Sequence, residues 1–167
     1  MGAYRQLSES EGAVEMNNFN IKITDNSAAF LAAMDERSDA LLEALGIEGV
    51  KNTALNITAS RRVDTGAYRN SFTYALAGQP AAISAYKGDR QSKYRPNAPI
   101  PSGTYSGNAP AGGKAVYIGS NLEYALYQEE GYHLPSGNFV AGTHALRNGV
   151  EALRGQAEAI ARKIMED

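Results

Sequence analysis

The segment from residue 78 to residue 114 constrains the fold of this 167-residue chain more than any other part of it. It holds five of the six prolines and six of the 17 glycines. Because proline and glycine at this density interrupt helices and the interiors of strands, the segment predicts one extended loop. The regular elements should therefore lie on its two sides.

Apolar residues at helical spacing predict a long helix on each side of the loop. The first follows the capping residues Asp25, Asn26 and Ser27 and ends near Arg61-Arg62. Because two glycines interrupt it, we predict either one kinked helix or two in tandem. The second should run for about five turns with Thr143 as its N-cap. The stripes are Phe30, Leu31, Met34, Leu41, Leu42, Leu45, Ile47, Val50, Ala54 and Ile57, then Leu146, Val150, Leu153, Ala157, Ile160 and Ile164.

Alternating apolar and polar residues predict several short strands. They cover residues 19–23, 70–76, 115–119 and 124–128, and residues 81–86 can extend the set. Together with the helices they predict an α+β fold, in which a long N-terminal helix and a C-terminal helix pack on one face of a small antiparallel β-sheet. We expect residues 17–167 to form this single domain, with residues 78–114 as an extended loop in the central hairpin. Residues 1–16 should be a flexible N-terminal arm.

Charge is distributed unevenly, although the formal net charge is only −2. Residues 1–50 carry three basic and nine acidic side chains, residues 51–115 carry nine and two, and residues 116–167 carry four and seven. A basic middle is compatible with nucleic-acid binding, but it also lets copies of one chain attract one another head to tail. Because the whole chain is acidic, we favour self-association.

Several chemistries are excluded by the residues available. The chain has no cysteine, so it can form neither a disulfide nor a thiolate metal site. Its two histidines, His133 and His144, have no acidic residue between them and supply too few ligands for zinc. The longest apolar run, residues 28–34, is too short to cross a membrane. No nucleotide-binding loop or nucleophile–histidine–acid pattern occurs, so we predict no cofactor and no enzyme.

The tripeptide Asp64-Thr65-Gly66 is also the catalytic signature of aspartic proteases. Such an enzyme pairs two of these loops, so this chain would have to act as a homodimer. Its loop should follow a buried strand, whereas Arg61 and Arg62 stand here at a charged helix end and would keep Asp64 ionised. We therefore interpret Asp64 as a brace for a turn, Thr65 as a local hydrogen-bonding residue and Gly66 as a source of backbone freedom. A homodimeric aspartic protease remains an alternative, as does a small nucleic-acid-associated adaptor that uses the basic, tyrosine-bearing loop.

Taken in order, these motifs resemble the tail-completion, or head–tail joining, family of tailed bacteriophages and prophages, which are minor tail components. That family has a long N-terminal helix, an Asp-Thr-Gly turn continued by Arg-x-Ser, and a hairpin ending in Val-x-Val/Ile-Gly. A Tyr-Ala-x-Tyr-x-Glu-x-Gly segment and an aromatic residue before the last helix follow. The hairpin loop here is longer than is typical, and only Pro135 remains of the proline-rich approach to the aromatic residue. The matching residues are Asp64, Thr65, Gly66, Arg69, Ser71, Val116, Ile118, Gly119, Tyr124, Ala125, Tyr127, Glu129, Gly131 and Phe139.

The resemblance implies a non-catalytic virion protein of the phage neck or tail. Copies of the chain would form a ring of about six subunits that joins or terminates the tail tube at the head–tail interface. Its partners would be itself, the tail tube or tail terminator protein, and the head–tail connector or adaptor proteins. DNA would pass through the ring without sequence-specific binding, and assembly would take place in the bacterial host cytoplasm.

The motif also leads to specific contacts that the structure can test. We expect Asp64 to accept hydrogen bonds from backbone amides or from Arg69 across its own turn. Glu129, at a strand end, should meet Arg61, Arg62 or Arg69 of the same or a neighbouring subunit. We further expect the loop of residues 78–114 to be mobile in a free subunit and to become ordered against a neighbour.

Overall fold

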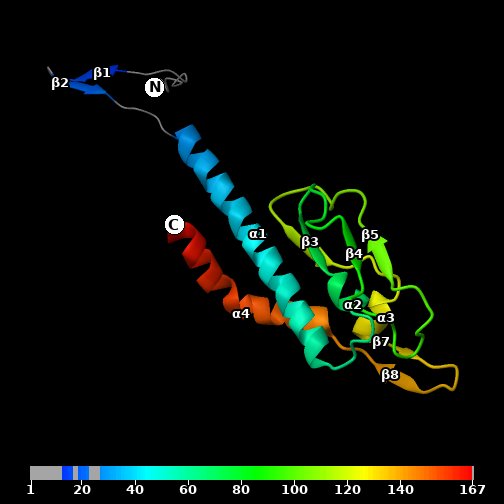
Figure 1. Cartoon of the computed structure of the whole chain (residues 1–167). Helices are drawn as coiled ribbons and strands as arrows, with labels where there is room; N and C mark the ends of the chain where they lie inside the picture. The colour runs from blue at the N-terminus through cyan, green and yellow to red at the C-terminus, as the bar shows by residue number, and fades with distance from the viewer. Residues whose placement is uncertain (1–12, 17–18, 23–26, 167) are drawn as a thin grey trace. The chain divides into compact units, whose positions relative to one another are not determined.

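The structure, a computed structural model, describes residues 13–16, 19–22 and 27–166. It confirms the α+β class: two long helices, α1 (Ser27–Ala59) and α4 (Ala145–Glu166), accompany short antiparallel strands (Figure 1). The chain divides into two compact units, residues 1–36 and residues 37–167. No helix among the described residues is long and apolar enough to cross a membrane.

The first unit contains a small hairpin. Strand β1 (Ala13–Met16) pairs with β2 (Phe19–Lys22), and Val14 stands opposite Ile21. Strand β2 confirms the strand predicted for residues 19–23. Strand β1 occupies the last four residues of the predicted arm, and the rest of that arm, residues 1–12, lies outside the described residues.

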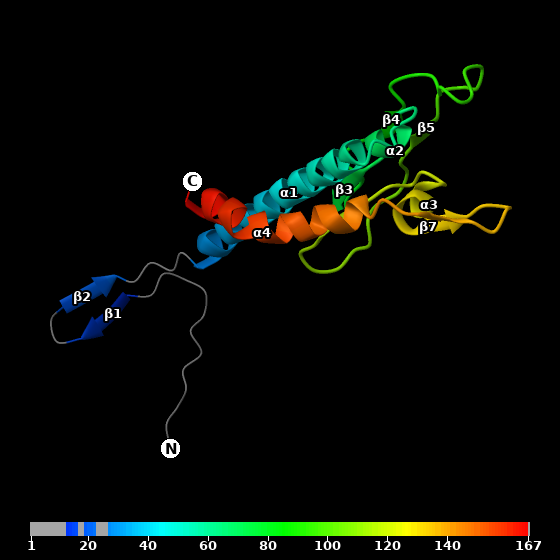
Figure 2. The ribbon, with the colours of Figure 1, turned by 90° about the horizontal axis from the view of Figure 1, so that it is seen from below.

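In the second unit, α1 runs on to Ala59 as one continuous helix, so the alternative of two helices in tandem is wrong (Figures 1 and 2). Gly46 and Gly49 do not break it, because both are buried under other side chains. A Cβ atom at Gly46 would lie 2.5 Å from Cδ2 of Tyr74, and one at Gly49 would collide with Ile118. These glycines therefore let the β3–β6 strand pair approach the helix closely.

Helix α4 runs beside α1 (Figure 2). The side chain of Asn52 donates to Oε1 of Gln156 over 2.8 Å, and that of Asn56 donates to the carbonyl of Ala145 over 3.1 Å. Gly149 lies against Thr53, so close that no larger residue fits without movement. The apolar stripe predicted for the terminal helix thus marks the face that packs on α1, as expected.

Among the described residues the strands form four separate antiparallel pairs instead of one sheet. In the second unit β3 (Thr73–Leu76) pairs with β6 (Val116–Gly119), which confirms the strand predicted at residues 115–119. The other pairs are β4 (Ala85–Lys87) with β5 (Ser102–Thr104), and β7 (Gly131–His133) with β8 (Phe139–Ala141).

Two predicted strands are corrected. Residues 124–128 belong largely to a helix, α3 (Ala125–Glu130), and residues 70–76 begin with the end of the short helix α2 (Ala67–Asn70). In α3 the buried residue Glu129 follows two strongly exposed ones, Leu126 and Tyr127. Burial therefore follows the spacing of a helix, and not the alternation of apolar and polar residues that predicted a strand here.

Residues 78–114 are mostly loop, as predicted, but they hold more regular structure than the sequence indicates. The β4–β5 hairpin lies inside the segment, and the chain on either side is linked by further hydrogen bonds. Gly78 donates to the carbonyl of Pro110 over 3.2 Å, and Gly88 donates to that of Pro101 over 2.9 Å. The prolines are tolerated because they act here as acceptors, for which no N–H group is needed.

The buried core is small. It consists of Ile57, Tyr68, Phe72, Tyr86, Leu122 and Ala145. The rings of Tyr68 and Phe72 meet edge to face, with centroids 5.4 Å apart. The core therefore joins the ends of α1 and α4 to α2 and the β4–β5 hairpin, and this is where the motif residues lie.

Gly149→Ala should destabilise the domain by about 1–3 kcal/mol, because the added methyl group overpacks the contact between α4 and α1. Its Cβ would lie 2.9 Å from the backbone nitrogen of Thr53. Gly155→Ala is the matched control in the same helix, since a Cβ there meets no atom within 4 Å. It should stabilise by about 0.5–1 kcal/mol through helix propensity. Urea denaturation of both variants measures the difference, and equal effects would contradict the close packing.

Candidate functional site

The site begins where α1 ends. Ser60 closes the last turn by donating from Oγ to the carbonyl of Ile57 over 2.7 Å. Arg61 then adopts the left-handed conformation, with φ of 58°, and its amide donates to the carbonyl of Thr58. Arg62 donates to the carbonyl of Ala141 in β8 over 2.5 Å. The chain is thus turned out of the helix and fixed beside the β7–β8 hairpin.

The turn at residues 64–66 leads into α2. Gly66 has φ of 81°, and a Cβ atom there would collide with the carboxylate of Asp89. The hydroxyl of Thr65 accepts from the amide of Ala67 over 3.3 Å. The local roles expected of Thr65 and Gly66 are therefore present.

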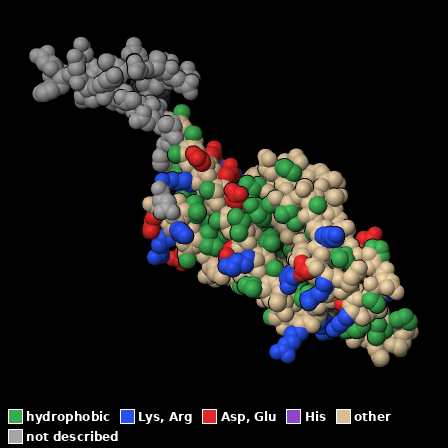
Figure 3. Space-filling model, in the orientation of Figure 1, with side chains coloured by type: hydrophobic (Ala, Val, Ile, Leu, Met, Phe, Trp, Pro, Cys, Tyr) green, Lys and Arg blue, Asp and Glu red, His purple; other side chains and the backbone are tan. Residues whose placement is uncertain are grey.

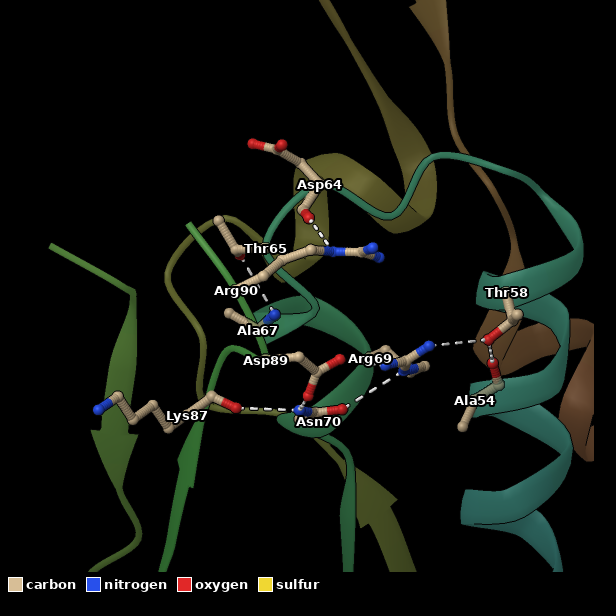
Figure 4. A network of polar contacts seen from close by, with 10 residues as sticks. All are labelled: Ala54, Thr58, Asp64, Thr65, Ala67, Arg69, Asn70, Lys87, Asp89 and Arg90. Atoms are coloured by element: carbon tan, nitrogen blue, oxygen red, sulfur yellow. Dashed lines mark hydrogen bonds and ion pairs between the residues drawn. The ribbon is translucent and has the colours of Figure 1, made fainter. Parts of the chain in front are cut away.

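Arg69 and Asn70 of α2 bind the residues that follow β4 (Figure 4). Arg69 forms an ion pair with Asp89, and the side-chain amide of Asn70 donates to the same carboxylate over 2.5 Å and to the carbonyl of Lys87 over 2.9 Å. The amide of Asp89 in turn donates to the carbonyl of Thr65 over 2.7 Å. Helix α2 is thereby tied to the residues that follow β4.

Asp64 anchors the next part of the loop. Its carboxylate accepts from Oγ of Ser92 over 2.5 Å and from the amide of Lys93 over 3.0 Å, and its carbonyl accepts from Nε of Arg90 over 2.9 Å. The expected partner Arg69 is wrong, because Arg69 pairs with Asp89. The Ser92 hydrogen bond lowers the pKa of Asp64, and the Lys93 amide and the nearby cations add to this against the opposing effect of desolvation. Both carboxylate oxygens of Asp64 thus accept hydrogen bonds from the same chain.

Glu129 makes the most buried polar contact of the site. Its Oε1 accepts from the amides of Leu146 and Arg147 over 2.9 and 3.1 Å, and its Oε2 accepts from the hydroxyl of Tyr68 over 2.9 Å. A carboxylate in this place caps α4 and meets the positive end of its dipole. The expected pairing with Arg61, Arg62 or Arg69 of the same chain is therefore wrong.

Tyr68 and Thr143 lie next to the capping carboxylate of Glu129. Burial raises the pKa of Tyr68, and the hydrogen bond and charge of Glu129 raise it further although Thr143 opposes them, so the hydroxyl remains a donor. Thr143 is not the N-cap of the terminal helix that we predicted: its hydroxyl donates to the carbonyl of Gln128 over 3.1 Å. Glu129 takes the capping role because its longer side chain reaches two amides.

Ser71 links α2 to the end of β6. It is fully buried, and its hydroxyl lies 2.9 Å from the carbonyl of Tyr68 and 2.6 Å from Oγ of Ser120. Its own carbonyl accepts from the hydroxyl of Tyr105 in the loop. Ser71 therefore acts as a polar contact inside the core.

The other motif residues divide into two groups. Tyr124 and Ala125 pack against the core, and Gly131 adopts φ of 95° at the start of β7. The motif residues from Asp64 to Ser71, together with Glu129, meet around α2, in a cluster that we call the junction. Tyr127 and Phe139 are each 58% exposed and take no part in it. The structure thus brings Asp64, Thr65, Gly66, Arg69, Ser71 and Glu129 together and leaves the two aromatic residues on the surface.

Beside the junction lies a concave surface, which we call the tyrosine groove. A hollow of about 270 Å³ is lined by Tyr94, Tyr127 and Tyr132 together with Arg61, Arg62 and Lys93. It adjoins a wider groove of about 620 Å³ that shares Tyr94 and Tyr132 and adds Arg95. The ammonium group of Lys93 lies 4.7 Å from the centroid of the Tyr94 ring. Exposed aromatic rings among cations suit a ligand that is both acidic and apolar.

Nothing in the described residues resembles a metal centre, because no three His, Asp or Glu side chains gather there. No protein-family model matches this chain, and no curated protein or solved structure matches it either. Evidence on function therefore comes from the residues and their geometry.

Several residues of the junction were not predicted from the sequence. Tyr68 lies within the quoted motif, and Asp89 is one of only two acids in the basic segment of residues 51–115, which marks it as a partner for a cation. Ser92 and Ser120 carry no such signal. They lie 28 and 49 residues from the side chains they bind, Asp64 and Ser71.

Asp64→Ala should release the loop around Ser92 and Lys93 without unfolding the domain, because the carboxylate is the anchor. We expect faster trypsin cleavage after Arg90 and Lys93 at neutral pH. In the wild type the anchor is fully present above pH 3.8, the ordinary pKa of Asp64, and is lost only as the pH falls through the lowered pKa of the folded state. Hydrogen exchange of the Lys93 amide against pH measures this loss.

Ser92→Ala removes one of the two hydrogen bonds and should give an intermediate cleavage rate. If Asp64→Ala were cleaved at the wild-type rate, the carboxylate would not anchor the loop.

Glu129→Ala should destabilise the domain by about 2–3 kcal/mol, because three donors lose their acceptor and α4 loses its cap. Glu130→Ala is the matched control, since the neighbouring carboxylate is exposed and pairs only with Arg147 over 3.2 Å. That exposed pair should contribute less than about 1 kcal/mol. Chemical denaturation measures both variants, and a small effect at Glu129 would show that α4 does not depend on it.

Proposed function

We propose that this chain is a structural virion protein of the phage neck or tail. Identical copies form a ring of about six subunits at the head–tail interface, where the ring joins or terminates the tail tube. The proposal rests first on the resemblance to the tail-completion family carried by the motifs from Asp64 to Phe139. In the virion the ring would meet the tail tube or terminator on one side and the connector proteins on the other.

One observation carries this proposal: the motif residues use their polar groups on the chain itself. The Asp64 carboxylate holds the loop, Arg69 pairs with Asp89, and Glu129 caps α4. Asp64 and Arg69 line the wider groove, but partners within the chain already bind their charged groups. These residues therefore fix the relative positions of helices and loop and leave no reactive group free. Such a junction suits a subunit whose task is to present surfaces to its neighbours.

The same geometry argues against the protease alternative. A protease aspartate shares a proton with a second aspartate, which requires a raised pKa in one of them. The hydrogen bonds from Ser92 and Lys93 instead lower the pKa of Asp64. Both carboxylate oxygens of Asp64 also accept from donors of its own chain, which leaves neither free to share a proton with a second copy.

A nucleic-acid adaptor is the second candidate, because the tyrosine groove favours it. Tyr94 is 76% exposed beside Lys93, and single-stranded nucleic acids stack on such rings. The whole chain is acidic, with a sequence pI of about 5.7. Because nucleic-acid-binding domains are typically basic, this favours the ring over the adaptor.

Analytical ultracentrifugation of the purified chain should show a species of about six times the 17.8 kDa subunit mass. Negative-stain electron microscopy should show rings. Because opposite charges hold the copies together, the oligomer should weaken as salt is raised through about 0.5 M.

A chain that stays monomeric at every concentration would contradict the ring. Salt-dependent retention of such a monomer on DNA would support the adaptor.

A further inference from the structure

The start of α1 exposes residues that belong to the apolar stripe. Leu31 is 62% exposed and Met34 is 41% exposed, although both lie at core-type positions of the helix. Asp35 and Glu36 follow them directly, and both are exposed. Large apolar side chains that are exposed on a helix beside charged ones are typical of a surface that another protein covers.

The tyrosine groove has the complementary character. Its three tyrosines are 76%, 58% and 36% exposed. Tyrosine and arginine are the residues most enriched where interfaces gain their binding energy. Figure 3 shows basic side chains gathered over the region of α2, α3 and β8, with hydrophobic side chains next to them.

We propose that the first turns of α1 in one copy dock in the tyrosine groove of the next copy. Leu31 and Met34 enter among the tyrosines, while Asp35, at the edge of the same helix face, meets Arg61 and Lys93. The inference rests on the proposed function, because it specifies how the copies of the ring meet. An amphipathic helix lying in a hydrophobic groove is an established mode of recognition.

A second copy fits this groove better than an unrelated partner does. Both surfaces belong to one chain, and their charges are opposite, since residues 1–50 carry six more acids than bases and residues 51–115 carry seven more bases than acids. One contact between copies covers both apolar surfaces at once. Because the two surfaces differ, the contact is head to tail, and head-to-tail contacts form a ring when the rotation between neighbouring copies closes.

The absence of cysteine from the chain allows a direct test by crosslinking. Ser38→Cys marks the face of α1 that carries Leu31 and Met34, and Ala141→Cys marks the wall of the groove. After the two variants are mixed in the full-length chain and treated with a short bismaleimide, we expect a covalent dimer of one copy of each. Ala40→Cys is the matched control, because two residues along a helix lie on nearly opposite sides, and it should give at least tenfold less product.

Charge variants test the same contact without a crosslinker. Arg61→Glu should lower the association constant at least tenfold, and adding Asp35→Arg in the same chain should restore most of it. Leu31→Ser with Met34→Ser should weaken association equally, whereas Leu55→Ser, which alters an apolar residue of α1 that is 57% exposed, should leave it unchanged.

The following outcomes would contradict the docking of α1 in the tyrosine groove, and the experiments tell them apart. Rings that form without the crosslink and without response to the charge variants would leave the proposed function standing and remove this docking. Dominant links between two Ala141→Cys copies would show a symmetric contact. If the groove variants changed only the retention of a single-stranded oligothymidine, the occupant would be nucleic acid. A monomer in every experiment would remove both proposals.

Discussion

The carboxylate of Glu129 joins three helices that lie far apart in the sequence. It belongs to α3, accepts from Tyr68 of α2, and caps α4 through the amides of Leu146 and Arg147. A buried charge is costly unless donors surround it, and here three donors and the positive end of a helix dipole do so. Because α4 also lies against α1 at Gly149, this one group fixes the helices of the second unit around the small core.

The loop and the groove depend on that arrangement. Once α2 is fixed, Arg69 holds Asp89, and Asp64 at the preceding turn holds Ser92 and Lys93. Tyr94 is thereby placed opposite Tyr127 and Tyr132, which the helix α3 and the β7–β8 hairpin supply. The surface that we propose for contact between copies is therefore held in place by Asp64, Arg69 and Glu129, which belong to the residues that carry the resemblance.

The sequence predicts the parts of this fold that depend on local periodicity. The stripes of α1 and α4 and the alternation of β6 place these elements correctly. Local patterns fail for α3, whose helix is set by the burial of Glu129, and for the prolines of residues 78–114, whose carbonyls accept from distant amides. The motif residues could be recognised as a group, but their partners could not. Asp64 binds a serine 28 residues away, and no spacing rule indicates such a contact.

The most direct test of this account is a double-mutant cycle between Tyr68→Phe and Glu129→Gln, measured by chemical denaturation. If the buried carboxylate joins the helices as described, the two changes should be coupled by about 1 kcal/mol or more. The double variant would then be less destabilised than the sum of the single variants. Strictly additive effects, within about 0.3 kcal/mol, would contradict the account, because the hydrogen bond between these two side chains would then contribute nothing to the fold.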